Sequence, residues 1–232
     1  MLHAELEALV GGLFEGPVAV SVASADMYDG GAFAAEDAAV AKAAPKRRRE
    51  FAAGRACARQ ALSRLGLAPQ AIPVGPGGAP IWPDGVVGSI SHCEGFCCAV
   101  ATRSGDVSGV GVDAEAAEAL TPRLRDFVCG PAEIAAFASL PDGPALDWGK
   151  LAFSAKEAFY KAYHPKLGAF LAFHDVQVAF VLEAPDRGAF SMTILHPGKP
   201  RLPHGESCVG RWRVDGARVY TGAMLRRTQL TD

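Results

Sequence analysis

Apolar residues recur at helical spacing in two long segments of the chain. Between Pro45 and Gly66 they follow one another every three or four positions, and a leading proline with a closing glycine is typical of a helix. A second long helix is predicted over residues 148–165, where a proline would end it. Shorter helices are predicted at 34–44 and 131–140.

Short apolar runs bounded by glycine and proline predict the strands. They lie at residues 17–23, 86–92, 96–102, 108–115, 173–182, 188–195, 208–214 and 217–224. Asp215 and Gly216 between the last two form a strong hairpin signal. The three runs within 86–115 could form a meander. Helices and strands are mixed with antiparallel connections, so we predict an α+β fold rather than a doubly wound parallel sheet.

Composition narrows the function classes. Half of the 232 residues are apolar, which allows one domain or two halves with a substantial core. The net charge of −2 gives no general attraction to nucleic acid or to an anionic membrane. The apolar runs are shorter than the roughly 18 residues that a transmembrane helix needs. The first residues contain glutamates and no basic segment, which argues against a secretory signal and predicts a cytoplasmic protein.

The six cysteines lie mostly in apolar segments and lack paired C-x-x-C spacing. We interpret them as reduced packing residues. Zinc is disfavoured, because Cys97 and Cys98 are adjacent in a predicted strand and would point to opposite faces.

Two acids, Asp113 and Glu115, end the predicted strand 108–115. Their period-2 spacing puts both carboxylates on one face of an extended chain, where they repel unless a cation lies between them. Ligation by oxygen alone suits Mg²⁺. For an isolated D-x-E the alternative is that both acids simply enter a solvated loop.

The predicted helix 148–165 supplies a third acid. Glu157 and Lys161 are four residues apart and share one face of the helix. Such a pair is usually surface decoration worth roughly 0.2–0.5 kcal/mol. Here the flanking residues are aromatic, so a partly buried Glu157 could complete a metal site with the two strand acids, and Lys156 and Lys161 could reach phosphates.

Basic residues form a stripe on the first long helix. Arg48, Arg55 and Arg59 lie on one side, with Lys46 and Arg47 adjacent. This stripe could be a solvated face or a nucleic-acid surface, but the negative net charge and the absence of interleaved aromatic residues favour a small phosphate-bearing ligand.

Ser91 and His92 are neighbours in the predicted strand 86–92. The histidine could donate to a phosphate or satisfy a backbone carbonyl. A Ser/His hydrolase is disfavoured, because Ser91 lacks the G-x-S-x-G elbow and neighbours on a strand point apart.

Four blocks in this order carry a family resemblance: RRREFAAGR, PIWPDGVVGSISH, GVGVDAE and FSAKEAFYKA. Over roughly residues 40–165 the chain resembles the 4′-phosphopantetheinyl transferases of the larger monomeric type, like enterobactin synthetase component D. The G-V-D-x-E and K-E-x-x-x-K blocks together are specific. The resemblance implies two similar α+β halves related by a pseudo-twofold axis, here residues 1–112 and 113–232, with the active site in the cleft between them.

The resemblance also implies a reaction. A serine hydroxyl of an apo carrier protein attacks the β-phosphate of coenzyme A, accepts phosphopantetheine and releases 3′,5′-ADP. Asp113, Glu115 and Glu157 would hold Mg²⁺, with Mn²⁺ as the alternative ion. Glu157, or a water on the metal, would take the serine proton, and Lys161 would stabilise or protonate the departing phosphate.

Further roles follow by the same resemblance. Lys156 and His92 would bind phosphates of coenzyme A with Ser91 close by, and Arg47 and Arg55 would contact the adenosine 3′-phosphate end. The chain departs from many relatives in two places. Residues 74–78 lack a basic residue, and Phe153 stands where many members have tryptophan.

The implied partners are apo carrier proteins or carrier domains of nonribosomal peptide, polyketide or fatty acid synthases, with siderophore synthesis among the pathways. We expect no nucleic acid, no membrane and a monomer. Two alternatives remain open: another Mg²⁺-dependent enzyme of nucleotide pyrophosphates, such as a hydrolase, and a non-catalytic carrier-binding relative that kept the fold.

Overall fold

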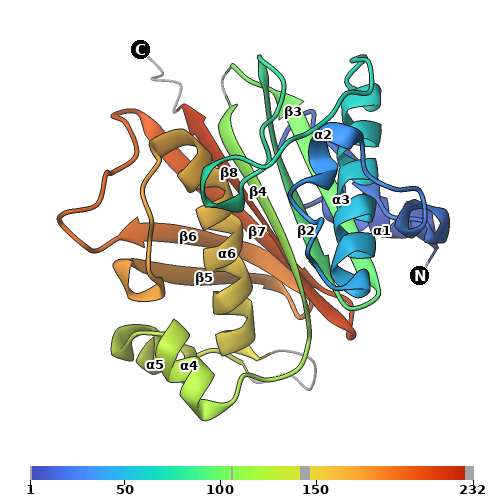
Figure 1. Ribbon diagram of the computed structural model, residues 1–232. Helices are drawn as coiled ribbons and strands as arrows, with labels where there is room; N and C mark the ends of the chain where they lie inside the picture. The colour runs from blue at the N-terminus through green and yellow to red at the C-terminus, as the bar shows by residue number, and fades with distance from the viewer. Residues whose placement is uncertain (1, 106, 142–146, 228–232) are drawn as a thin grey trace.

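Two antiparallel sheets and the helices that cover them make up the described part of the chain (Figure 1). The computed structural model describes residues 2–105, 107–141 and 147–227. The helices are α1 (His3–Gly11), α2 (Ala34–Asp37), α3 (Pro45–Arg64), α4 (Pro122–Val128), α5 (Pro131–Phe137) and α6 (Trp148–Leu167). The strands are β1 (Ala19–Val22), β2 (Val86–Cys93), β3 (Phe96–Arg103), β4 (Val107–Ala116), β5 (Val176–Ala184), β6 (Arg187–Ile194), β7 (Glu206–Val214) and β8 (Arg218–Arg227).

The strand order is β1-β3-β2 in one sheet and β4-β8-β7-β6-β5 in the other. The predicted α+β class is therefore confirmed. The predicted meander is wrong in its third strand, because β4 pairs with β8, with Asp113 opposite Thr221, and not with β3. β2 and β4 nevertheless lie side by side at the centre of the molecule, where the two sheets meet (Figure 1).

Helix α3 covers the three-stranded sheet. Pro45 occupies its first turn, where the missing N–H costs nothing, and its apolar face packs on β3 through Ala53, Cys57 and Ala61. The packing of α3 on β3 leaves the N-terminal turns of α3, with their arginines, beside the end of β2.

The six cysteines of the chain are free thiols, as predicted.

Helix α6 covers the five-stranded sheet at very close range. A Cβ on Gly109 would lie 2.5 Å from the carbonyl oxygen of Ala162, and one on Gly111 would overlap that of Ala158. The two glycines of β4 therefore let the α6 backbone approach the strand. Asp147 caps the first turn by accepting from Lys150 N, and the helix runs past Pro165 to Leu167, two residues further than predicted.

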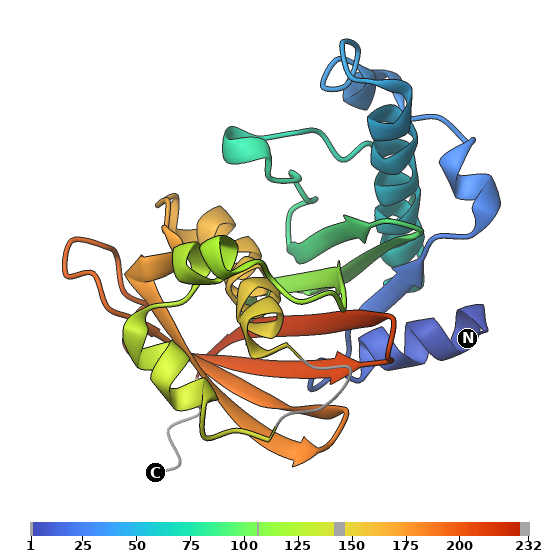
Figure 2. The ribbon, with the colours of Figure 1, turned by 90° about the horizontal axis from the view of Figure 1, so that it is seen from below.

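A third core joins the two sheets on the side of α1. It contains Val10, Leu13 and Phe14 together with apolar residues of β3, β4 and β8, including Ala114. In Figure 2 α1 lies on the opposite side of the strands from α3. Because this core is shared by both sheets, it fixes the position of β2 against β4.

Several predicted boundaries differ from the structure. The predicted helix 34–44 keeps only four helical residues, and α4 was not predicted, although Thr121 caps it and Pro122 opens it. The proposed boundary between residues 112 and 113 falls inside β4, and the division into halves stays a prediction. In the ranges that the structure describes, no helix has both the length and the apolar character to cross a bilayer.

Candidate active site

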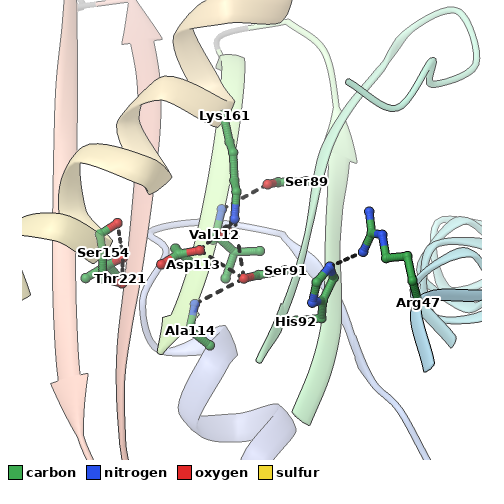
Figure 3. Close-up of polar contacts among 10 residues, drawn as sticks. All are labelled: Arg47, Ser89, Ser91, His92, Val112, Asp113, Ala114, Ser154, Lys161 and Thr221. Carbon is green, nitrogen blue, oxygen red and sulfur yellow. Dashed lines mark hydrogen bonds and ion pairs between the residues drawn. The ribbon is translucent and has the colours of Figure 1, made fainter. Parts of the chain in front are cut away.

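Two serine hydroxyls connect β2 to β4 (Figure 3). Ser89 Oγ accepts from Val112 N at 3.1 Å, and Ser91 Oγ accepts from Ala114 N at 3.1 Å. Ser91 Oγ also donates to Asp113 Oδ1 at 3.0 Å. These side chains satisfy buried N–H groups of β4 where a neighbouring strand would otherwise do so. The predicted site thus begins at the junction of the two sheets.

Asp113 and Lys161 form the centre of the site (Figure 3). Lys161 Nζ donates to Asp113 Oδ1 at 2.6 Å, to Val112 O at 3.2 Å and to Ser91 Oγ at 3.3 Å. Burial alone would lower the pKa of Lys161, but the attraction of Asp113 outweighs it and the pKa is raised. Lys161 therefore carries a positive charge at neutral pH.

The second oxygen of Asp113 is different. Asp113 is only 3% exposed, and its Oδ2 is buried without a hydrogen-bond partner among the described residues. A carboxylate oxygen left in this state costs free energy unless a cation or a donor meets it. Asp113 is therefore half satisfied by the protein and half free to bind a further group.

Glu115 and Glu157 lie near Asp113, on β4 and α6. Glu115 points to the same face as Asp113, as its spacing predicted, and forms an ion pair with Lys150 at 3.7 Å. Burial raises the pKa of Glu115, and the charge of Asp113 raises it further. The pKa of Glu157 is raised by burial and by Asp113, against the opposing effect of Lys161. The three carboxylates thus repel one another.

The trio does not form a closed coordination cluster. Within the described ranges, no three His, Cys, Asp or Glu side chains gather closely enough to hold an ion. The donor chemistry nevertheless fits a hard divalent cation, because the acids offer carboxylate oxygens, one of them buried and unpartnered. A cation there would also relieve the repulsion that raises the pKa values of Glu115 and Glu157.

The basic side of the site lies on α3 and the end of β2. Arg47 Nη1 contacts His92 Nε2 (Figure 3), and His92 has a lowered pKa because of burial and the charge of Arg47. Arg55 is only 5% exposed, stacks over the ring of Phe51 at 4.4 Å, and has a buried Nε without a partner in the described chain. Burial lowers the pKa of Arg55 to about 10.

The rest of the predicted basic stripe does not share this environment. Arg59 is paired with the buried carboxylate of Glu36 at 2.9 Å, so it has a structural partner. Arg48 is exposed. Arg55 is therefore the buried member of the stripe with unused hydrogen-bonding capacity, which an anion could use.

Lys156 does not join the predicted site. It is 2% exposed, and its Nζ donates to Glu133 Oε2 at 2.8 Å and to the carbonyl oxygens of Val128 and Phe173 at 2.9 Å. These three acceptors use all three N–H groups of the ammonium. The structure therefore corrects the prediction that Lys156 binds a phosphate, because the ammonium group has no N–H left to donate. Lys156 lines the same hollow as Glu157, but its ammonium group is turned into the protein toward these three acceptors.

Two hollows flank the site along α6. One, of about 430 Å³, lies beyond Lys161 between α6 and the segment 75–82, where Gly77 lies against His164. The other, of about 190 Å³, lies beside Glu157 and is mainly apolar. Its walls include Phe127, Tyr160, Phe170, Leu171 and Phe173. No local sequence pattern indicates this second hollow, because its aromatic residues come from three separate segments.

Comparison with known proteins identifies the family of the chain. The family model of the 4′-phosphopantetheinyl transferase N-terminal domain matches residues 35–102, and that of the 4′-phosphopantetheinyl transferase superfamily matches residues 109–210. The second match extends well past the roughly 40–165 stretch that carries the recognised motifs. Together the two matches include the β2–β4 junction, strands β5 and β6 and part of β7, and they leave out β1 and β8.

Individual relatives give the same result. The chain is 43% identical over 194 residues to 4′-phosphopantetheinyl transferase Svp of Streptomyces mobaraensis. This alignment covers 82% of this chain and 76% of Svp. It is 39% identical over 189 residues to 4′-phosphopantetheinyl transferase PptT of Mycobacterium tuberculosis, covering 80% and 82%. Enterobactin synthase component D of Salmonella typhi is 40% identical over 129 residues, covering 53% and 50%.

The two-sheet α+β fold brings acids and bases together where the sheets meet, and relatives named as transferases over most of the chain define a transferase. The protein belongs to the 4′-phosphopantetheinyl transferase family. The resemblance seen in the sequence blocks is thereby confirmed.

Proposed function

We propose that this protein transfers 4′-phosphopantetheine from coenzyme A to a serine hydroxyl of an apo carrier protein and releases 3′,5′-ADP. The observation that carries the proposal is the divided environment of Asp113. One carboxylate oxygen is held by Lys161 and Ser91, and the other is buried and unpartnered. Such a group is suited to hold a cation against a diphosphate. Phosphoryl transfer depends on this kind of positioning and charge neutralisation more than on covalent catalysis by the protein.

Asp113, Glu115 and Glu157 are the residues that would hold the divalent ion, Mg²⁺ or in its place Mn²⁺. When bound, the ion neutralises charge on the diphosphate. Lys150 would release Glu115, with which it now pairs at 3.7 Å. A long ion pair of this kind, partly open to solvent, is weak enough to exchange for a cation.

Arg55, Arg47 and His92 would bind the adenosine 3′-phosphate end of coenzyme A. Arg55 is the main anchor, because its guanidinium is already desolvated and rigid against Phe51, and its Nε has no partner in the described chain. A phosphate there gains charge-assisted hydrogen bonds without a further desolvation cost for the arginine. The short contact between Arg47 and His92 would open to admit the same phosphate.

The chemical step needs one base and one cation from the chain. The serine oxygen forms a bond to the β-phosphorus, the bond from this phosphorus to the bridging oxygen breaks, and 3′,5′-ADP departs with that electron pair. Glu157 takes the serine proton. Lys161, held protonated by Asp113, stabilises the charge that develops on the departing phosphate.

The apolar hollow beside Glu157 would hold the pantetheine arm, which is uncharged and has methyl and methylene groups that pack against an apolar wall. Two aromatic residues that line this hollow, Phe127 and Phe170, are 64% and 65% exposed. Exposed apolar residues of this size beside a reactive site favour a protein partner. We place the docking carrier protein or carrier domain there. Carriers of nonribosomal peptide, polyketide, fatty acid and siderophore synthesis are the candidates.

A carrier panel tests this function. The protein is incubated with Mg²⁺, coenzyme A and apo carriers of each class, and the mass of each carrier is measured. We expect at least one carrier to gain one phosphopantetheine. Cleavage of coenzyme A without any carrier gain would favour a pyrophosphate hydrolase, and coenzyme A binding without either product would favour a non-catalytic relative. The monomeric state, the cytoplasmic location and the lack of nucleic-acid or membrane partners stay predictions.

A further inference from the structure

A buried ion pair lies one residue away from Glu157 and outside the reactions above. Lys156 and Glu133 are 2% and 3% exposed, and Lys156 Nζ lies 2.8 Å from Glu133 Oε2. Replacing a buried ion pair by apolar residues is often neutral or stabilising, so stability alone gives little reason for this pair. The position of the pair beside the apolar hollow suggests a second role.

The hydrogen bonds of the pair join four separate segments to α6. Lys156 binds the carbonyl oxygen of Val128 at the end of α4 and that of Phe173 in the turn before β5. Glu133 Oε2 accepts from Gly130 N at 2.8 Å at the start of α5, and Oε1 accepts from Val178 N of β5 at 2.7 Å. We call these two residues, Glu133 and Lys156, the clamp.

The segments that the clamp joins are those that wall the apolar hollow. Phe127 directly precedes the Val128 carbonyl, and Phe173 supplies both a carbonyl to the clamp and a ring to the wall. The rings of Phe127 and Phe173 meet edge to face, with centroids 5.7 Å apart. The opposite wall belongs to α6, through Lys156 itself, Glu157 and Tyr160.

We propose that Glu133 and Lys156 are positioning residues that fix the distance between this aromatic wall and α6. They thereby set the width of the hollow that takes the pantetheine arm. This inference rests on the proposed function. According to this inference, Lys156 affects the binding of the pantetheine arm by positioning the wall of the hollow, and it does not contact a phosphate of coenzyme A. The clamp should therefore affect ligands that have the arm and spare ligands that lack it.

The test compares two ligands by calorimetry in the presence of Mg²⁺. One is coenzyme A, and the other is adenosine 3′-phosphate 5′-diphosphate, which has every phosphate of coenzyme A but no pantetheine. For Lys156→Met we expect coenzyme A to bind about tenfold or more weakly, as misplacement of a wall by a fraction of an ångström can cause. The ligand without the arm should bind as it does to the wild type.

Three further measurements and one control variant complete the test. Glu133→Gln keeps the size of the side chain and an acceptor for Val178 N, so it should fold even if Lys156→Met does not, and it should give the same split between the two ligands. The double variant should bind coenzyme A no more weakly than the single variant with the lower affinity. In transfer assays KM for coenzyme A should rise while kcat at saturation stays close to wild type. Arg64→Met, which removes a partly buried pair with Glu7 far from the cleft, controls for a general loss of stability.

The outcomes separate the two claims. Equal weakening of both ligands would show that Lys156 contacts phosphate and would overturn the inference. Unchanged binding of both ligands by folded clamp variants would overturn it as well. If the wild type binds neither ligand, the proposed function fails instead.

Discussion

Replacing Ser91 by alanine tests how the protein holds its central acid. Ser91 Oγ accepts from Ala114 N and donates to Asp113 Oδ1. The substitution leaves Ala114 N, on a fully buried residue, without its acceptor, which costs about 1–3 kcal/mol. Loss of a hydrogen bond to a charged carboxylate adds about 1 kcal/mol or more. We therefore expect the free energy of unfolding to fall by about 2–4 kcal/mol.

Ser89→Ala is the matched control. Ser89 makes the equivalent bond to Val112 N but none to Asp113 or Lys161, so this variant should lose only about 1–3 kcal/mol. Urea unfolding without ligand compares the two variants. In the transfer assay Ser91→Ala should lose about tenfold or more in kcat, because Asp113 Oδ1 keeps only Lys161 of its two partners and the carboxylate is less precisely placed, while Ser89→Ala stays near wild type.

Two results would contradict this reasoning. If the two variants are equally stable and equally active, Ser91 has no special link to Asp113. If instead Ser91→Ala raises KM for coenzyme A with kcat unchanged, the hydroxyl contacts the ligand, as the sequence resemblance implied, and does not orient the acid.

Three more predictions follow from the site. Burial raises the pKa of Glu157, so the contribution of this carboxyl group to stability is present below its ordinary pKa of 4.5 and is lost as the pH rises through the pKa of the folded state. Glu157→Gln should therefore abolish transfer yet raise the free energy of unfolding at pH 7 by roughly 0.5–2 kcal/mol, with no gain near pH 4; equal stability at both pH values would refute the sign. Arg55→Met should weaken coenzyme A binding by roughly 10- to 100-fold but leave dephospho-coenzyme A unaffected in calorimetry, and equal losses for both would remove Arg55 from the 3′-phosphate. Phe127→Ser should raise KM for the carrier protein more than KM for coenzyme A, and a carrier KM like that of wild type would place docking elsewhere.

Local patterns predicted most of the elements but not how the sheets are assembled. Helix α3 begins at a proline, and the β7–β8 hairpin turns at Asp215 and Gly216, because these signals depend on a few neighbouring residues. The place of β4 depends on β8, about a hundred positions further on, and on glycines that admit α6. The pattern of residues 86–115 does not predict that β4 pairs with β8 or that α6 packs on it.

The same limit applied to the site. Spacing on β4 was enough to put Asp113 and Glu115 on one face, and Lys161 indeed meets Asp113. Spacing on α6 could not tell that Lys156 points inward, because its partner Glu133 lies on another helix and reads in the sequence as a capping residue. The resemblance places Ser91 close to the ligand, which stays a prediction. Spacing alone does not show the hydrogen bonds of its hydroxyl, since the β2–β4 contact that they form joins two sheets.

The central claim is that Asp113, Glu115 and Glu157 bind one divalent ion beside Lys161. The most direct measurement is a titration of Mn²⁺ in the presence of coenzyme A, with free Mn²⁺ followed by electron paramagnetic resonance. The wild type should bind one Mn²⁺ per chain, and Asp113→Asn should bind it at least about tenfold more weakly, because the buried, unpartnered oxygen becomes part of a neutral amide. Equal Mn²⁺ affinity for the wild type and Asp113→Asn would contradict the account.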